Sequence, residues 1–209
     1  MKRIIHKCIL CVLIFCLAGC AKRNFFPDED DPGLSRFTFH GYNIATAYIN
    51  EVPYINPFYG TNLFGIAPPP GNAIPVLSKV ATNSVFDTLS LSWPIEKNNN
   101  TQASNSYFNS TISLLMPVPK SFSLNDFLAL SGQRFSSNTN SIMLQGFLNK
   151  PPDTLYGSSN IYLVEISVDS TESYKHIVFS GLFNGNIADS ILITKGRFDF
   201  AIDANKINF

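Results

Sequence analysis

The chain has 209 residues, of which 45% are hydrophobic, and its 15 basic residues balance 15 acidic ones. This length suits one domain with a substantial hydrophobic core, and the absence of a basic stripe in the sequence argues against a nucleic-acid partner. All four cysteines lie at or before position 20, which excludes thiol catalysis, disulfides and cysteine-ligated zinc from the rest of the chain.

The first 20 residues have the pattern of a bacterial lipoprotein signal. Three basic residues near the start precede an apolar run over 8–17 that is too short to span a bilayer. The run ends in Leu17-Ala18-Gly19-Cys20, which resembles the sites where a signal is cut before a cysteine that carries acyl chains such as palmitate. The alternative is a cytosolic protein with an apolar N-terminal strand.

We therefore predict a signal peptide over 1–19 and a lipidated Cys20 that holds the protein on a membrane. Cleavage would remove three basic residues and no acid, which leaves a net charge of about −3. The expected location is the cell envelope, on the periplasmic or the surface face of the outer membrane.

Residues 20–33 are predicted to form the lipidated cysteine and a flexible tether, because they mix charges with prolines and show no hydrophobic periodicity. The acids over 28–31 resemble sorting signals that send some lipoproteins to the outer face of the outer membrane. A solvated spacer is the alternative explanation for the same residues.

Residues 34–209 are predicted to form a single antiparallel β domain, more sandwich-like than barrel-like, with a β-barrel as the alternative. Asn184-Gly185 favours a hairpin reversal, and Gly196 indicates a bulge or a close backbone approach. Short runs rich in β-branched and aromatic residues predict strands over 36–40, 42–49, 74–80, 85–93, 107–118, 141–148, 161–168, 176–183 and 191–202.

One short helix is predicted near residues 123–130. Ser123 and Asp126 have the spacing of a capping box, and Leu124, Phe127 and Leu128 share a helical face. We expect this helix to cover one end of the sheet structure.

Four aromatic residues are candidate ligand contacts. Tyr54, Phe58 and Tyr59 lie in or beside a proline-rich segment, and Trp93 precedes Pro94 at a strand end. Exposed aromatic side chains at such positions can stack on sugar rings or dock a partner protein. The alternative is that the segment folds back and covers an open end of the sheet structure.

Four Asp-Ser or Asp-Thr dipeptides resemble the O-glycosylation acceptor of secreted Bacteroidota-type proteins. Such dipeptides also mark strand starts, because their side chains hydrogen-bond the turn backbone. The candidate acceptors are Thr88, Thr154, Ser170 and Ser190.

Candidate catalytic and metal-binding residues are few. His40 and His176 are flanked by strand residues, a position more typical of packed or surface histidines than of ligands, and no metal or cofactor is expected. A glycosidase-like carboxylate pair would have to come from scattered acids whose spacing singles out no pair, namely Glu51, Glu96, Glu165 and Glu172.

Two segments resemble a group of uncharacterised lipoproteins of Bacteroidota-type bacteria. Residues 45–54 (ATAYINEVPY) are similar to an early hairpin of that group, with Glu51 where glycine is common. Residues 179–183 (FSGLF) and 193–200 (ITKGRFDF) are similar to its terminal hairpin. The resemblance implies an all-β lipoprotein and supplies no catalytic residues.

The function predicted from the sequence is a membrane-anchored, non-catalytic module that binds a glycan or an envelope protein. The first alternative is a structural or accessory subunit of an outer-membrane complex. The second is a glycan hydrolase.

Overall fold

The computed structural model describes residues 27–56, 75–97, 110–147, 154–169, 175–188, 190–207 and 209. These residues form ten β-strands, one α-helix and one 3₁₀ helix. None of the helices among them combines the length and the apolar character that crossing a bilayer requires.

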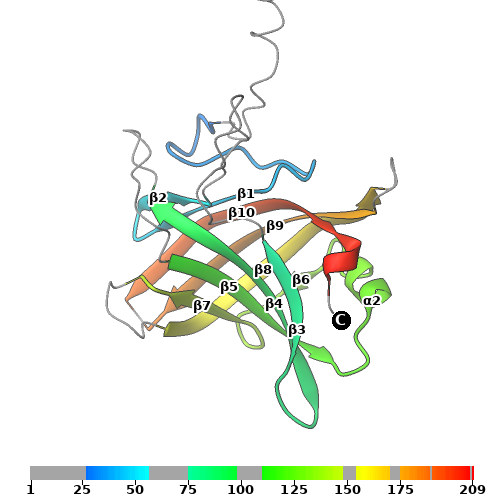
Figure 1. The fold of residues 1–209 in the computed structure, drawn as a ribbon. Coiled ribbons are helices and arrows are strands. Elements are labelled where there is room, and N and C mark those ends of the chain that lie inside the picture. The colour runs from blue at the N-terminus through cyan, green and yellow to red at the C-terminus, as the bar shows by residue number, and fades with distance from the viewer. Residues whose placement is uncertain are drawn as a thin grey trace, which may run out of the picture.

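Eight of the described strands close into an antiparallel β-barrel (Figure 1). The ring runs β1-β10-β9-β8-β7-β5-β4-β2, and β2 closes it by pairing with both β1 and β4. β3 pairs with the first half of β4, and β6 pairs with β8. The strands are β1 Ile44–Ile49, β2 Val52–Ile55, β3 Val76–Ala81, β4 Phe86–Lys97, β5 Ser110–Pro119, β6 Arg134–Phe135, β7 Ser141–Gln145, β8 Thr154–Asp169, β9 His176–Ile187 and β10 Ile191–Asp203.

The all-β prediction is confirmed, and the barrel alternative is the architecture that forms. The preference for a sandwich is wrong. The four-residue strand β2 pairs with β1 on one side and with β4 on the other, and this pairing joins the strands into one closed sheet. Inward and outward residues alternate in both architectures, so hydrophobic alternation cannot distinguish them.

Several predicted turns and strands also change. Asn184 and Gly185 lie inside β9, and the reversal comes later, where Ala188 adopts a positive φ of 49°. Residues 36–40, predicted as a strand, are not in one. The bulge near Gly196 is confirmed, since the β9–β10 register shifts between Ile193 and Gly196.

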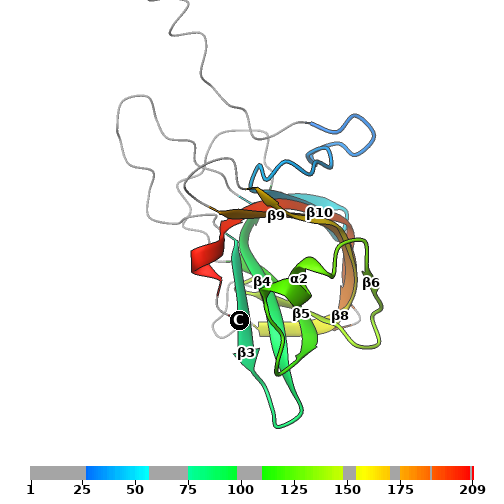
Figure 2. The same cartoon turned by 90° about the vertical axis from the view of Figure 1, so that its right-hand side faces the viewer.

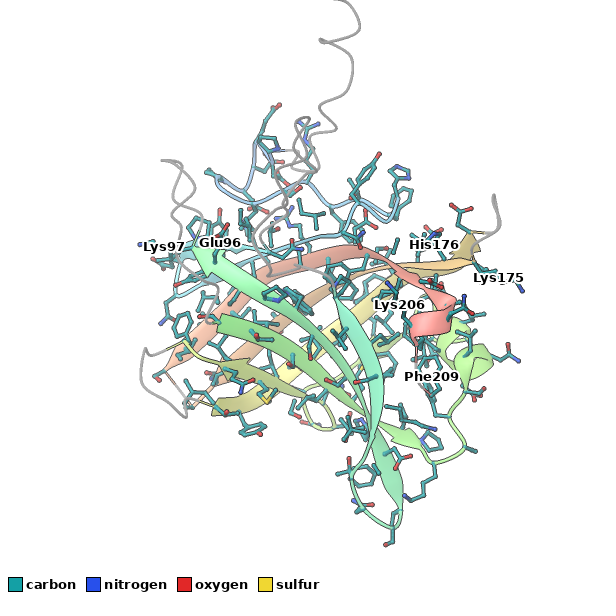
Figure 3. The ribbon with its side chains drawn as sticks, in the orientation of Figure 1. Glu96, Lys97, Lys175, His176, Lys206 and Phe209 are labelled. Carbon is teal, nitrogen blue, oxygen red and sulfur yellow. The ribbon has the colours of Figure 1, made fainter. Side chains whose placement is uncertain are left out.

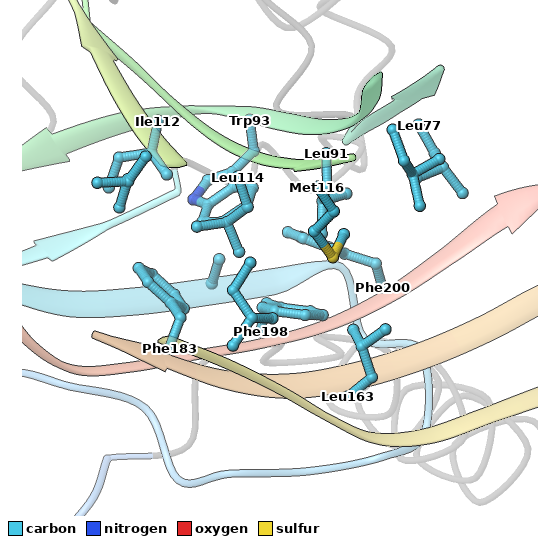
Figure 4. Packing of buried hydrophobic residues seen from close by; sticks show 14 of the residues in the cluster. Leu77, Leu91, Trp93, Ile112, Leu114, Met116, Leu163, Phe183, Phe198 and Phe200 are labelled. Carbon is cyan, nitrogen blue, oxygen red and sulfur yellow. The ribbon is translucent and has the colours of Figure 1, made fainter. Parts of the chain in front are cut away.

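The barrel interior is filled by large apolar side chains (Figure 4). Trp93 on β4 contacts three phenylalanines from β9 and β10, with ring centroids 5.5–5.9 Å apart. All four aromatic residues are at most 4% exposed. The middle of the barrel is therefore occupied by these rings. The three phenylalanines are Phe183, Phe198 and Phe200.

The short helix α2 (Leu124–Leu128) lies at one end of the barrel, as predicted (Figure 2). Ser123 caps it and forms the capping box with Asp126. Phe127 is 1% exposed and packs against Phe179 inside the barrel. Phe209 also packs against Phe127, and Figure 3 shows it near the helix at the same end.

Residues 27–42 cross the outside of the barrel over β1 and β10 (Figures 1 and 2), and we call them the strap. Arg197 on β10 binds the carboxylates of Asp28 and Asp31 in the strap. Asp199, two residues further along β10, accepts four hydrogen bonds from strap residues Thr38, His40, Gly41 and Tyr42. The predicted tether is therefore a folded part of the domain from residue 27 onward, whereas residues 20–26 lie outside the described residues.

Candidate functional site

The filled barrel interior excludes Trp93 as a ligand contact. Its indole is 2% exposed and packs among the phenylalanines of the core, which corrects the sequence-based prediction. The residue stands next to Pro94, but it faces inward in the regular alternation of β4. Proximity to a proline therefore did not mark a strand end, because β4 continues to Lys97.

Tyr54 is half-buried in β2, where its ring lies 5.7 Å from that of Phe147. Burial raises the pKa of its hydroxyl above the usual value of 10.0. It lies on the strand that pairs with Glu96 and Lys97, which Figure 3 places at the end of the barrel away from α2. The two other candidate aromatics, Phe58 and Tyr59, lie outside the described residues, as does Cys20.

A groove of about 710 Å³ lies instead on the outer wall of the barrel, and we call it the outer groove. Its floor is formed by β8, β9 and β10, one wall by the strap, and the other wall by β6 and the residue that follows it. The side chains that project from these elements and line it are Asp31, Phe37, Arg134, Ser136, Asn160, Tyr162, Leu182, Asn184, Lys195 and Arg197.

The strand register places four of these residues in one row across the floor. Arg134 pairs with Tyr162, Tyr162 with Leu182, and Leu182 with Arg197. Since neighbouring strands lie about 4.8 Å apart, the row is roughly 14 Å long. An arginine thus stands at each end of a short apolar floor, in which Leu182 is 40% exposed.

The two arginines differ in their partners. Arg197 is 8% exposed and is neutralised by Asp28 and Asp31. Arg134 is exposed and lies over the ring of Tyr162, with Cζ 4.6 Å from the ring centroid. It forms no salt bridge with any residue in the described part of the chain. Its positive charge is therefore available to a ligand.

Two amides flank the floor in the neighbouring row. Asn160 and Asn184 are directly opposite each other on β8 and β9, and the Asn160 Nδ2 group donates to Asn184 Oδ1 over 3.0 Å. Asn160 Oδ1 accepts from the backbone N–H of Ser137, which fixes the orientation of that amide. Asn160 engages the oxygen of Asn184, so this contact leaves the Nδ2 donors of Asn184, a lining residue of the groove, unused.

The bulge in β10 places Lys195 at the strap side of the groove. Lys195 adopts a positive φ of 49°, and its ammonium group binds Asp31. Bulges commonly re-aim a side chain in this way. The hydrogen bond from Lys195 lowers the pKa of Asp31, and the hydrogen bond from Arg197 lowers that of Asp28, below the usual value of 3.8.

The predicted acids and histidines do not converge on the outer groove. Glu51 lies in the β1–β2 turn, Glu165 lies in β8, and Glu172 is outside the described residues. His40 and His176 are exposed and belong to different elements. Within the described residues, no three side chains of the histidine, cysteine, aspartate or glutamate types are grouped to hold a metal ion.

The candidate glycosylation sites differ in accessibility. Ser190 is exposed in the turn between β9 and β10, whereas Thr88 is partly buried in β4, where its hydroxyl lies 2.6 Å from that of Thr82. Thr154 is partly buried at the start of β8, and Ser170 lies outside the described residues. Glycosylation at these positions stays a prediction.

Sequence reasoning did not find the outer groove. Its residues are ordinary outward-facing positions on three strands and on the two-residue strand β6, and only the register brings them together. Comparisons with protein-family models, with curated proteins and with solved structures found no match.

Proposed function

We propose that this chain is a non-catalytic binding module of the bacterial envelope, held on a membrane by acyl chains on Cys20, and that the outer groove is its ligand-binding surface. One observation carries the proposal. The barrel interior is filled by its own side chains, whereas the outer wall presents a groove with an unneutralised arginine, two amides and an apolar floor. Ligand sites commonly combine apolar lining with a few placed polar groups in this way.

The proposal of a non-catalytic role is supported by the ion pairs of the aspartate that lines the groove. Asp31 is the carboxylate among the lining residues, and both Lys195 and Arg197 hold it in ion pairs. Glycoside hydrolysis requires two carboxylic groups facing the bond that is cleaved. The described groove offers no second one.

The distance between the proposed lipid anchor and the folded domain is short. Residues 21–26 separate Cys20 from Pro27, the first described residue of the strap. A fully extended chain of that length spans at most about 25 Å. The barrel would therefore be held close to the membrane, with the strap and the adjoining outer groove on the side nearest to the anchor.

The anchoring half of the proposal is tested by metabolic labelling with a clickable fatty acid in a Gram-negative host. The wild-type chain is expected to incorporate the label and to sediment with membranes, and Cys20→Ala is expected to do neither. Cys16→Ser is the matched control, because it removes a cysteine from the signal segment and leaves the acceptor intact. Equal labelling of the wild-type chain and Cys20→Ala would contradict the proposed anchor.

The binding half is tested with the wild-type lipoprotein purified in detergent micelles and applied to glycan and peptide arrays. Binding to at least one class that is reduced by Leu182→Asp, which places a charge on the groove floor, would support the proposal. Binding that Leu182→Asp leaves unchanged would place the ligand surface elsewhere. Leu192→Asp is the control, since Leu192 is also an exposed strand leucine (55%) and does not line the outer groove.

A further inference from the structure

We propose that the outer groove binds an acidic saccharide, with a uronic acid carboxylate on Arg134 and sugar hydroxyls on the amides of Asn160 and Asn184. This inference rests on the proposed function and names the ligand class of the same surface. It follows from three features of the groove, which are its charge, the unused donors of its amides and the paired backbone that forms its floor.

The charge of the groove favours an anion. Its lining contains three cationic side chains and one carboxylate. Lys195 and Arg197 share Asp31, and Arg197 also binds Asp28 beneath the strap, so these charges are compensated internally. The guanidinium of Arg134 forms no salt bridge among the described residues and lies over the ring of Tyr162. A guanidinium fork matches a carboxylate with two parallel hydrogen bonds.

The remaining polar groups favour a ligand rich in oxygen acceptors. The Asn160–Asn184 hydrogen bond uses the oxygen of Asn184, which lines the groove, and does not engage its Nδ2 donors. Leu182 and Phe37 supply apolar surface beside these donors. A pyranose ring matches both the amide donors and the apolar surface. Its hydroxyl and ring oxygens accept hydrogen bonds, and its C–H face packs on apolar side chains.

The floor of the groove disfavours a peptide strand as the occupant. Extended peptides bind by adding to an exposed sheet edge, where main-chain groups are unpaired. In the outer groove β9 is paired on both sides, with β8 and β10, and β10 is paired with β1. The backbone of the floor is therefore already hydrogen-bonded, and recognition must come from side chains. The volume of about 710 Å³ lies in the range of small-molecule sites and suits a short oligosaccharide.

The test is calorimetric titration of the full-length lipoprotein in detergent micelles with three ligands of similar length. These are a galacturonic acid trisaccharide, the neutral galactose trisaccharide and a tri-glutamate peptide. We expect the acidic sugar to bind at least about tenfold more tightly than either of the others, since only it satisfies both the arginine and the amides. Raising the salt concentration should weaken this binding.

Two arginine variants locate the site. Arg134→Gln is expected to weaken binding of the acidic trisaccharide by about tenfold or more and to leave the neutral sugar unaffected. Arg36→Gln is the matched control, because Arg36 is also exposed, pairs with Glu29 and does not line the outer groove. It is expected to retain affinity within about twofold. Circular dichroism of each variant checks that the barrel remains folded.

Three results would overturn the inference: tighter binding of tri-glutamate than of the acidic sugar, no binding of the acidic sugar to the folded protein, or equal losses in Arg134→Gln and Arg36→Gln. These results are distinguishable from failure of the proposed function. A neutral glycan or a protein that binds in the array experiment and is sensitive to Leu182→Asp would preserve the binding module and reject only the acidic saccharide.

Discussion

Trp93 on β4 and Phe183 on β9 lie edge to face, with ring centroids 5.5 Å apart and an interplanar angle of 73°. Their strands are four positions apart around the ring in either direction, so the two residues come from opposite walls of the barrel. This single contact spans the interior, and Figure 4 shows the two rings approaching from facing strands. Because side chains from opposite walls meet here, the proposed ligand surface lies on the outside of the molecule.

Trp93→Ala is expected to lower the free energy of unfolding by about 3–5 kcal/mol, because it leaves a large cavity between opposite walls. Urea titration followed by circular dichroism measures the loss. Trp93→Phe is the control, since it keeps an aromatic ring in the same place and should cost markedly less. Equal and small losses in both variants would mean that the interior is not closed at this level.

Arg197→Met is expected to detach the first part of the strap, around Asp28 and Asp31, from β10, whereas Asp199 still holds its last part. The variant leaves Asp28 and Asp31 without their shared partner in a site where these side chains are 17% and 13% exposed. Removing one member of a buried ionic cluster costs about 3 kcal/mol. Urea unfolding measures the stability loss, and faster hydrogen exchange over 27–42 would localise it to the strap.

Arg36→Met provides the matched comparison for the strap. Its ion pair with Glu29 joins side chains that are 57% and 87% exposed. Such pairs contribute about 0–1 kcal/mol, so this variant should be close to wild type. If Arg197→Met and Arg36→Met behaved alike, the ionic contacts at Arg197 would not be what holds the strap.

Acidification should release the strap in the same way. Hydrogen bonds from Arg197 and Lys195 lower the pKa values of Asp28 and Asp31 below 3.8. The stability that these carboxylates contribute is therefore complete above their unfolded pKa and is lost as the pH falls below 3.8 through their folded pKa. The hydrogen-exchange protection factors over 27–42, corrected for the slower intrinsic exchange at low pH, are expected to fall in the wild type between pH of about 6 and about 3. Arg197→Met should show a smaller change, because its strap is already loosened at the higher pH.

The sequence predicted secondary structure better than it predicted architecture. Local signals gave the helix cap at Ser123 and the bulge at Gly196, since capping chemistry and the lack of a Cβ act on neighbouring residues. A Cβ at Gly196 would lie 2.6 Å from the ring and the carbonyl oxygen of Phe183. Barrel closure through β2 joins residues far apart in sequence, and no local pattern records such a pairing.

The outer groove was missed for the same reason. Strand β7 and the first half of β8 lie between Arg134 and Tyr162 in the sequence, yet the two residues are direct cross-strand neighbours. The acids over 28–31 were interpreted as part of a solvated tether, because an acidic run with prolines has the composition of a linker. Their partner Arg197 lies at the other end of the chain, so composition could not reveal the contact.

The β1–β2 turn offers a stabilising substitution. Asn50 and Glu51 form a two-residue turn between Ile49 and Val52, and both adopt positive φ values, of 47° and 66°. This is the geometry of a type I′ turn, in which glycine is favoured at the second position because it has no Cβ. The turn therefore forms with a glutamate at the position where its geometry favours glycine.

Glu51→Gly is expected to raise the free energy of unfolding by about 0.5–1 kcal/mol, because relief of the left-handed conformation outweighs the greater freedom of glycine in the unfolded chain. Urea unfolding at neutral pH measures the gain. Glu51→Ala separates conformation from charge, since it removes the carboxylate and keeps the Cβ. It should give no gain, and an equal increase in both variants would assign the effect to the carboxylate instead of the backbone.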